Sequence, residues 1–356
     1  MLRYHSLPVS GIRPDGEHAV YVDFAVPPAL VAEYWHRPGQ HVGIRAVIDG
    51  EEIRRNYSLA NAPGTDRLSI GVRRQPQGRL SQHLATRVRV GDSLDVLAPN
   101  GSFQTTPSAE RSRYYVGFAA GSGIAGILSI LSSVLETEPN SRCVLFYGNR
   151  DTGRIMFLEE LLALKDRYLG RFALHFVNSR ETQEIELLNG RLDADKVRQF
   201  SGRLFEPELV DECFLCGPGD MIEAIQTVLV EKGIPASRIH SEHYTVEAAA
   251  RPVRSAPERE AARESEVTVL IDGRRRTFRM PMQGESIVDA AARAGIDLPF
   301  ACKGGVCSTC RTRVVQGAVE MAQNYALEPE EVASGWVLAC QSQPTTAVLE
   351  LDYDAR

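Results

Sequence analysis

The segment CKGGVCSTC, residues 302–310, places three cysteines on one short stretch, and a fourth cysteine, Cys340, follows in VLACQ. Four thiols of this kind indicate a metal centre. A zinc site usually closes its tetrahedron with two CxxC pairs, whereas here three thiols share one loop and only one returns from a distance. Gly304, Gly305 and the small Ser308 leave backbone amides free to hydrogen-bond sulfur. The spacing therefore disfavours zinc.

Length and composition describe an ordinary globular chain. Its 356 residues are 43% hydrophobic and 24% charged, which is enough for two or three domains, and its net charge of -6 gives no reason to expect nucleic acid as a partner. The first residues lack the apolar run of a signal peptide, so we expect a cytoplasmic, reducing location with free thiols. Tyr114–Leu135 is uncharged but rich in glycine in its first half, which favours strand, turn and helix over a membrane span.

Changes in pattern divide the chain into four parts. Residues 1–108 alternate short β-rich runs with turn residues and predict a small antiparallel β-barrel. In residues 109–247 strands alternate with helices, which predicts a parallel α/β nucleotide-binding domain. Residues 248–265, AAARPVRSAPEREAARES, have the composition of a solvated linker, and residues 266–356 form a small C-terminal domain.

Two local signals organise the C-terminal domain. VTVLIDGRRRTFRM predicts a hairpin that turns at Asp272 and Gly273. SIVDAAARAG predicts a short helix that begins after Ser286 and ends at Gly295. The cysteine segment follows at once, on a loop.

The parallel domain carries the glycine pattern GSGIAG at Gly121–Gly126, between a predicted strand and a predicted helix. In that position backbone amides can approach a pyrophosphate at a helix N-terminus. Sites selective for NAD usually present an acidic residue after the next strand, but Arg150 stands there, and Arg180 follows the strand after it. Two guanidinium groups suit a 2′-phosphate, so we expect NADPH rather than NADH. The alternative is that both arginines are solvated loop residues.

Cys213 and Cys216 form a CxxC in CFLCGPGDM. Such a pair is typical of a redox site or of half a zinc site, but no second pair accompanies it in this domain. We therefore predict that Cys213, like Cys143 in CVLFYG, is a core thiol, and that Cys216 lies at the carboxyl edge of the sheet, where ligands bind.

The barrel contains RNYS, Arg55–Ser58. An arginine, an aromatic ring and a hydroxyl near a strand end could hold a phosphate, stack on a flat ring and donate a hydrogen bond, although these residues alone do not indicate a flavin. GRLSQHL, residues 78–84, could place a helix N-terminus against a phosphate or form a capped surface helix.

Taken together, these pieces resemble a known superfamily. The motifs PGQH, RNYS, GVRR, GRLS, GSG and CGP occur in the order found in the ferredoxin-NADP reductase superfamily, and C-x4-C-x2-C with a distant fourth cysteine resembles the plant-type 2Fe-2S ferredoxin domain. The segments YGNR, ACKGGVC, NYALEPEE and GWVLACQ look most like the reductase subunits of phenylacetyl-CoA epoxidases. The resemblance implies a multidomain fold: an FAD-binding antiparallel β-barrel, an NADP-binding parallel α/β domain and an α+β ferredoxin domain of the β-grasp type.

The resemblance also implies roles for individual residues. Arg55 would meet the FAD pyrophosphate, Tyr57 would pack on the isoalloxazine, and Ser58 would reach flavin N5. Further FAD contacts are implied at Arg73, Gly78, Leu80 and Ser81. Contacts with the nicotinamide and its phosphates are implied at Gly121, Ser122, Gly123, Cys216, Gly217 and Pro218. Contacts near the 2′-phosphate are implied at Ser179 and Arg180. We expect Arg150 to contact the same phosphate, because it follows the preceding strand.

Ser58, Cys216 and Glu242 would lie at the reacting rings, as the residues closest to the chemistry. Many relatives have Thr-Pro after GSGI, whereas this chain has Ala125 and Gly126, so one hydroxyl is missing. In the superfamily's usual assignment, the cluster ligands divide between two irons as Cys302 with Cys307 and Cys310 with Cys340.

These parts imply one electron path, from NADPH to FAD to the 2Fe-2S cluster and then to an oxygenase. A flavin is needed because it accepts a pair of electrons and releases them singly. The expected partner is the diiron oxygenase of the phenylacetyl-CoA epoxidase complex of aerobic phenylacetate degradation. The alternatives are the reductase of another aromatic-ring oxygenase, either a Rieske enzyme or a diiron monooxygenase, and a non-enzymatic 2Fe-2S carrier. The linker would let the cluster domain move between flavin and partner.

Overall fold

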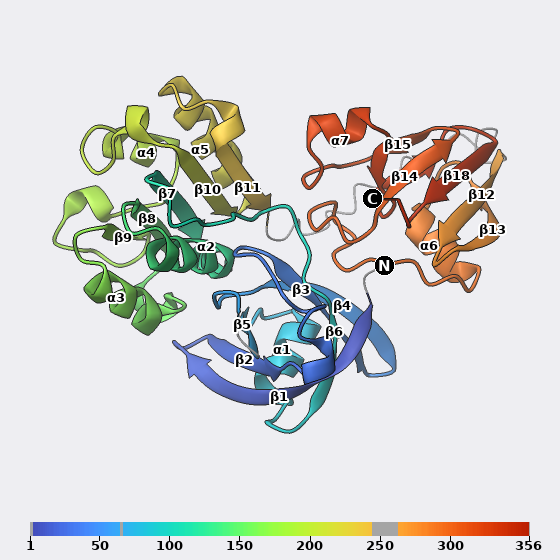
Figure 1. The fold of residues 1–356 in the computed structure, drawn as a ribbon, viewed down its shortest axis with the longest axis horizontal. Helices are drawn as coiled ribbons and strands as arrows, with labels where there is room; N and C mark the ends of the chain where they lie inside the picture. Colours follow the sequence, from blue (N-terminus) through green and yellow to red (C-terminus); the bar gives the residue numbers. More distant parts are fainter. Residues whose placement is uncertain (1–2, 65–66, 244–262, 356) are drawn as a thin grey trace. The chain divides into compact units, whose positions relative to one another are not determined.

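A computed structural model describes residues 3–64, 67–243 and 263–355. The chain forms two compact units, one of residues 4–244 and one of residues 245–356 with residues 1–3, and each is described by itself (Figure 1). Most of the predicted linker, residues 248–262, lies outside the described residues. Its last two residues, Glu264 and Ser265, are already part of strand β12 (Glu264–Ile271), so the strand begins earlier than predicted.

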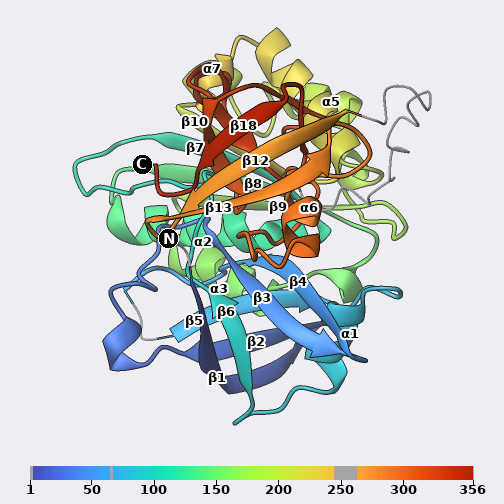
Figure 2. The same cartoon turned by 90° about the vertical axis from the view of Figure 1, so that its right-hand side faces the viewer.

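The first unit starts with six antiparallel strands in the order β4-β3-β6-β1-β2-β5 (Figures 1 and 2). They are β1 (Tyr4–Asp15), β2 (Ala19–Ala25), β3 (His41–Ile48), β4 (Glu51–Ser58), β5 (Arg67–Arg73) and β6 (Ser93–Leu97). A bridge between Leu59 and Ile70 joins the end of β4 to β5, so the two edges of the sheet meet. Helix α1 (Arg79–Thr86) buries Leu80 and Leu84 in the barrel core. The predicted antiparallel barrel is confirmed.

The same unit continues as a five-stranded parallel sheet in the order β11-β10-β7-β8-β9. Its strands are β7 (Tyr114–Ala120), β8 (Arg142–Asn149), β9 (Phe172–Asn178), β10 (Glu212–Gly217) and β11 (Ile239–His243). Its helices are α2 (Ile124–Thr137), α3 (Leu158–Arg167), α4 (Ala194–Phe200) and α5 (Gly219–Glu231). The strand order reverses between β7 and β10, and ligands of such sheets bind outside the carboxyl ends at that point.

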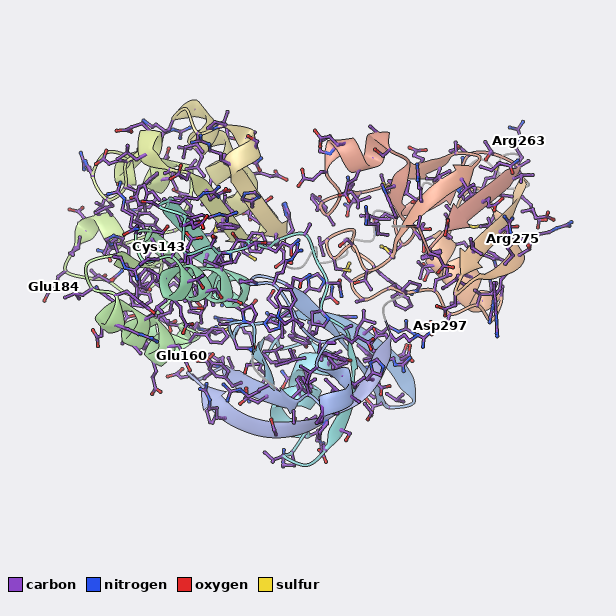
Figure 3. All side chains as sticks on the ribbon, in the orientation of Figure 1. Cys143, Glu160, Glu184, Arg263, Arg275 and Asp297 are labelled. Atoms are coloured by element: carbon purple, nitrogen blue, oxygen red, sulfur yellow. The ribbon has the colours of Figure 1, made fainter. Side chains whose placement is uncertain are left out.

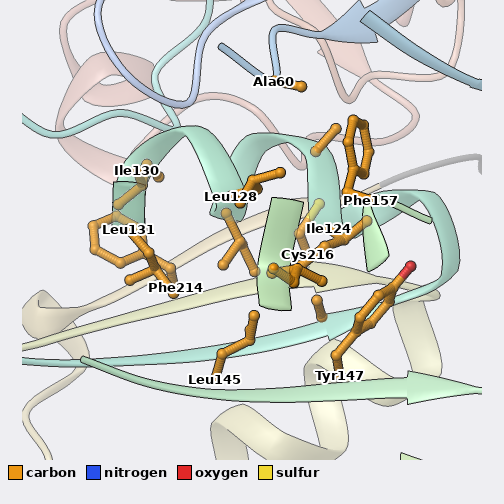
Figure 4. Packing of buried hydrophobic residues seen from close by; sticks show 14 of the residues in the cluster. Ala60, Ile124, Leu128, Ile130, Leu131, Leu145, Tyr147, Phe157, Phe214 and Cys216 are labelled. Atoms are coloured by element: carbon orange, nitrogen blue, oxygen red, sulfur yellow. The ribbon is translucent and has the colours of Figure 1, made fainter. Parts of the chain in front are cut away.

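Both faces of the parallel sheet are buried, as its apolar strands predict. Along β8, Leu145 and Tyr147 face a core shared with α2, whereas Val144 and Phe146 face a second core with α4 and α5. Figure 4 shows α2 lying across the first of these faces. The uncharged stretch is thus β7, a tight turn and α2, and no helix among the described residues is long and apolar enough to cross a membrane.

An apolar seam joins the barrel to the parallel sheet. Tyr21 of β2 meets Phe157 edge to face, with ring centroids 4.7 Å apart. Gly71 of β5 lies so close to Phe157 that an added Cβ would stand 2.3 Å from the ring. Ala60, after β4, belongs to the same core and is visible beside α2 in Figure 4. The barrel and the sheet therefore share one core and have a fixed spacing.

Asp15, at the end of β1, caps the N-terminus of α3 across this seam. Its Oδ1 accepts a hydrogen bond of 2.8 Å from the backbone N–H of Phe157, which holds a left-handed φ of 58° just before the helix. Its Oδ2 is buried and has no hydrogen-bond partner among the described residues. Burial raises the pKa of Asp15 to about 6, although the Phe157 N–H acts in the opposite direction. The seam therefore contains a buried carboxylate that takes up a proton as the pH falls through about 6.

Replacing Asp15 by Asn should stabilise the unit above pH 7, because the amide keeps an acceptor for Phe157 and removes a buried charge. The pKa of Asp15 is raised from 3.8 to about 6 on folding, so we expect a gain of about 1–3 kcal/mol. The wild type recovers this difference as pH falls through 6 toward 4, since its folded form then binds the proton. Unfolding midpoints across pH 5–8, followed by flavin fluorescence, measure it.

The matched control is Asp166→Asn, which changes an exposed carboxylate on α3. Because that side chain is exposed, its replacement should change the free energy of unfolding by less than about 0.5 kcal/mol. An Asp15→Asn difference that stays constant or widens toward acid would contradict the prediction.

The second unit is a small mixed sheet in the order β13-β12-β18-β14-β16, with a separate pair β15-β17. Besides β12, its elements are β13 (Arg274–Pro281), β14 (Arg311–Gln316), β15 (Val319–Met321), β16 (Trp336–Leu338), β17 (Ser342–Pro344), β18 (Val348–Asp352), α6 (Ile287–Arg293) and α7 (Pro329–Ala333). Both β12 and β18 lie inside this sheet and run parallel to one another. Figure 3 labels Arg275 on the edge strand β13.

Both local predictions for this unit are confirmed. Asp272 and Gly273 turn the β12-β13 hairpin with φ values of 50° and 69°, as a two-residue type I′ turn requires. The Ser286 hydroxyl accepts a hydrogen bond of 3.2 Å from the Asp289 N–H at the start of α6. Gly295, with a φ of 75°, follows the end of that helix.

Candidate functional site

Two glycine loops meet at the point where the parallel strand order reverses. One follows β7 at Gly121–Gly123, and the other comprises the last two residues of β10 and the next residue, Cys216–Pro218. An added Cβ on Gly123 would stand 2.2 Å from the Cys216 carbonyl oxygen, so only glycine allows the loops to approach this closely. Gly121 adopts a φ of 57°, and its carbonyl accepts a 2.8 Å hydrogen bond from the Tyr147 hydroxyl. The predicted nucleotide loops are therefore neighbours at the binding edge of the sheet.

Glu242 joins the barrel to this edge. It lies on β11 opposite Cys216 of β10. Its Oε2 accepts a 3.2 Å hydrogen bond from the Ser58 hydroxyl and lies 4.0 Å from the Cys216 sulfur. Its Oε1 lies 3.3 Å from Nδ1 of His41, which is buried at the start of β3. The three residues predicted closest to the chemistry are thus brought together, although their separation in sequence is large.

The electrostatics of this group keep one member neutral. Burial raises the pKa of the Cys216 thiol well above its usual value, and the nearby Glu242 carboxylate raises it further. Cys216 therefore stays a thiol rather than a thiolate, which suits packing against a flat ring better than nucleophilic attack.

His41 is a site residue for which the sequence analysis predicted no role. The only signal was its place in PGQH, one of the motifs that carried the resemblance. The structure pairs His41 with Ser58 across the antiparallel β3 and β4 strands, so both present polar atoms to Glu242. That pairing depends on strand register, which the sequence motif does not contain.

The RNYS motif presents its residues alternately along β4. Arg55 is exposed, and its Nη1 donates a 2.7 Å hydrogen bond to the backbone carbonyl of Arg54. Arg54 itself is buried and paired with Glu52 at 2.7 Å. Burial raises the pKa of Tyr57, which therefore keeps its hydroxyl proton. An exposed guanidinium and an aromatic ring two residues apart fit a phosphate and a flat ring, respectively.

The other predicted FAD contacts use their side chains within the protein. Arg73 donates from Nη2 to the carbonyl of Arg154, at 2.8 Å, and so ties β5 to the loop after β8. Leu80 lies in the barrel core. The Ser81 hydroxyl donates to the Gly78 carbonyl at 2.9 Å, and an added Cβ on Gly78 would stand 2.4 Å from that hydroxyl oxygen. Contacts from Gly78 and Leu80 with a cofactor would therefore have to come from the backbone.

Arg150 and Arg180 lie side by side at the carboxyl ends of β8 and β9. The backbone N–H of Arg180 donates to the carbonyl of Arg150 at 2.7 Å, and both residues are exposed, as is Ser179. The carboxylate of Glu181 accepts hydrogen bonds from the backbone N–H and the hydroxyl of Thr152. These bonds lower the pKa of Glu181. The two arginines are thus neighbours through their backbones, and among the described residues no ion pair joins either of them to Glu181.

The cysteine loop is shaped for sulfur ligands. Cys302 contacts both Cys307 and Cys340, and Cys340 also contacts Cys310. The backbone N–H of Gly304 donates to the Cys302 sulfur at 3.3 Å. The loop backbone enters the left-handed region at its non-glycine positions Lys303 and Ser308, where φ is 52° and 48°, and at Gly305, where φ is 75°.

Within the described part of the chain, no three histidine, cysteine or acidic side chains are arranged to hold a single metal ion. Four thiols that contact one another in pairs, with a backbone donor aimed at one of them, fit a cluster that spreads its ligands over two irons. Cys143 and Cys213, by contrast, are fully buried core thiols whose pKa is raised by burial, as predicted (Figure 3 labels Cys143).

Comparison with known proteins supports each part of this description. The oxidoreductase FAD-binding domain family matches residues 24–105, the oxidoreductase NAD-binding domain family matches residues 118–227, and the 2Fe-2S iron-sulfur cluster binding domain family matches residues 269–345. The predicted FAD and 2Fe-2S cofactors are therefore confirmed, with NAD(P)H as the electron donor. Because both oxidoreductase domains are present, the alternative of a non-enzymatic carrier is set aside.

Relatives and solved structures extend the likeness to the whole chain. One of the subunits of 1,2-phenylacetyl-CoA epoxidase from Escherichia coli (strain K12) is 41% identical over 356 residues, which is 100% of this chain and 99% of that protein. The ferredoxin reductase component of 3-ketosteroid-9-alpha-monooxygenase from Rhodococcus rhodochrous is 32% identical over 353 residues, which is 98% of this chain and 96% of that protein. The crystal structure of phthalate dioxygenase reductase shares the fold, with a TM-score of 0.57 at 21% identity over 98% of both chains. This chain therefore belongs to the family of oxygenase reductases that pass electrons from NAD(P)H through FAD to a 2Fe-2S cluster within one polypeptide.

Proposed function

We propose that this chain is the NADPH-dependent reductase of a phenylacetyl-CoA epoxidase complex. The observation that carries the proposal is the 41% identity with the Escherichia coli epoxidase protein, which extends over the full length of this chain and 99% of that one. The identity with the 3-ketosteroid-9-alpha-monooxygenase component is lower, at 32%. That second likeness makes the reductase of another oxygenase the alternative candidate, because the same modules would serve it equally well.

We assign the flavin to the barrel side of the seam. Arg55 would bind the FAD pyrophosphate, Tyr57 would pack on the isoalloxazine, and Ser58 would donate to it, with Glu242 behind the hydroxyl. Bound there, the flavin supplies the chemistry that separates a hydride into single electrons. His41 contacts the other oxygen of the Glu242 carboxylate, so that the carboxylate is held by the barrel although it belongs to the sheet.

We assign the nicotinamide to the crevice beside Gly121–Gly123 and Cys216–Pro218. The neutral Cys216 thiol would pack against its ring, and Ser122 would approach its phosphates. The preference for NADPH is assigned to Ser179, Arg150 and Arg180, because these lie together at the carboxyl ends of β8 and β9. A planar guanidinium binds a phosphate through two parallel hydrogen bonds, which a ribose hydroxyl cannot match.

Replacing Arg180 by Ala should raise KM for NADPH by about tenfold, which corresponds to about 1.4 kcal/mol of lost binding, and should leave KM for NADH almost unchanged. Steady-state reduction of a dye that accepts electrons from the flavin measures both constants. Arg203→Ala is the control, since Arg203 is an exposed arginine of the same domain that follows α4. Equal effects on both nucleotides would remove the assignment of the 2′-phosphate to Arg180.

Replacing Cys307 by Ser should abolish the cluster without affecting reduction of the flavin by NADPH, because Cys307 belongs to the unit that does not contain the flavin residues. Iron content, the visible spectrum and stopped-flow flavin reduction give the three readouts. Cys143→Ala changes a cysteine in the core of the parallel domain and should keep its iron. Electron delivery to a one-electron acceptor protein at the wild-type rate by Cys307→Ser would contradict the proposed path.

The partner is tested by reconstitution. The purified chain, with NADPH, should support turnover of phenylacetyl-CoA by the oxygenase component of a phenylacetyl-CoA epoxidase. We expect a rate at least about tenfold above that with a Rieske ring-hydroxylating oxygenase and its substrate, which corresponds to about 1.4 kcal/mol of discrimination. Cytochrome c reduction, measured in parallel, shows that the reductase itself is active. Equal or preferred coupling to the Rieske enzyme would favour the alternative candidate.

A further inference from the structure

Tyr353 brings a hydroxyl from the end of the C-terminal strand to the cluster end of the second unit. Strand β18 pairs with β14 so that Asp352, its last residue, lies opposite Arg313, and Tyr353 follows directly. Arg313 is three residues after the ligand Cys310. The backbone N–H of Tyr353 donates to the Leu270 carbonyl at 2.9 Å, which fixes its position on β12. Tyr353 is therefore held next to the strand that leaves the cysteine loop.

The Tyr353 side chain packs against the core cluster that contains Cys310 and Cys340. Its hydroxyl oxygen is buried and has no hydrogen-bond partner among the described residues. The hydroxyl of Thr312, two residues after Cys310, is also buried and has no hydrogen-bond partner among the described residues. Burial raises the pKa of Tyr353 well above its usual value. The Tyr353 hydroxyl thus keeps its proton and can act as a hydrogen-bond donor.

A buried hydroxyl without a partner is unfavourable, and most such groups in folded proteins do find one. A 2Fe-2S cluster held by the four cysteines brings sulfur acceptors to this region, as thiolates and as the sulfides of the cluster. Hydrogen bonds to those sulfurs stabilise the reduced cluster more than the oxidised one, because the reduced form carries one more negative charge. The sulfurs would therefore supply the acceptor that the described residues do not give to the Tyr353 hydroxyl.

We propose that the Tyr353 hydroxyl donates a hydrogen bond to a sulfur at the Cys310 and Cys340 end of the cluster and raises the reduction potential of the cluster. Tyr353 is then a positioning and tuning residue, because it makes electron transfer from the reduced flavin more favourable without ligating iron. The inference rests on the 2Fe-2S assignment alone and is independent of which oxygenase accepts the electrons.

The test is Tyr353→Phe in the full chain, which removes one oxygen and keeps the ring. We expect iron content, flavin content and flavin reduction by NADPH to be unchanged. The equilibrium constant for cluster reduction should fall about tenfold, which is a shift of about 59 mV for one electron. A redox titration followed by the electron paramagnetic resonance signal of the reduced cluster measures it. Tyr325→Phe is the control, because Tyr325 lies in the same unit and is 37% exposed.

A second measurement keeps the test decisive if Tyr353→Phe fails to assemble. Incorporating 3-fluorotyrosine at position 353 preserves the shape of the ring and makes the hydroxyl a stronger donor, so the potential should rise. The exchangeable proton of the Tyr353 hydroxyl should be magnetically coupled to the reduced cluster in the wild type and in the fluorinated protein. Exchange of the wild type into deuterium oxide should alter that coupling. An unchanged cluster reduction potential in both Tyr353→Phe and the 3-fluorotyrosine protein would overturn the proposal. Equal changes of the potential in Tyr353→Phe and Tyr325→Phe would also overturn it. Loss of the signal in every protein, the wild type included, would instead refute the cluster.

Discussion

The packing of Phe157 between the barrel and the parallel sheet is the contact on which the flavin and nicotinamide sites depend. Phe157 is fully buried, meets Tyr21 edge to face and occupies the space that Gly71 leaves open. Burial of one such side chain contributes about 2–3 kcal/mol, which is enough to keep two domains in one arrangement. Hydride transfer needs its reacting atoms about 3–3.5 Å apart. The rigid seam fixes the spacing between the barrel and the parallel sheet, on which that distance depends.

The polar contacts across the seam follow from this apolar core. Glu242 comes from the last strand of the sheet, while His41 and Ser58 come from the barrel, and the carboxylate can meet both only if the two domains do not slide. Arg73 and Asp15 add hydrogen bonds from the barrel to the loop and helix that follow β8. A shift of the sheet along the seam would therefore break contacts at the site and at the seam together.

Sequence alone predicted those features whose causes lie within a few residues. The turn at Asp272 and Gly273, the cap at Ser286 and the glycine loop at Gly121 each follow from local backbone geometry, and the structure has all of them. The alternation of strands and helices predicted the parallel sheet for the same reason. The early start of β12 was missed because its first residues share the Glu and Ser composition of the linker, although Ser265 is fully buried.

The contacts that sequence could not predict join residues far apart in the chain. His41 and Glu242 are 201 residues apart, and Asp15 caps a helix at Phe157 that is 142 residues away. Neither pairing has a local signal, since each depends on how a barrel strand meets the edge of another domain. Arg73 shows the same limit: its motif implied a cofactor contact, but its guanidinium also has a partner at the Arg154 carbonyl.

The division into two units places the residues proposed for hydride transfer and the cluster cysteines on separate hydrophobic cores. The residues proposed for hydride transfer all belong to the first unit, where one shared core positions them. The donors around the cysteines belong to the second: Gly304 reaches the Cys302 sulfur, and the Gln341 amide lies 3.8 Å from the Cys340 sulfur. Because each unit has its own core, a change near the cysteines alters the cluster potential without moving Glu242.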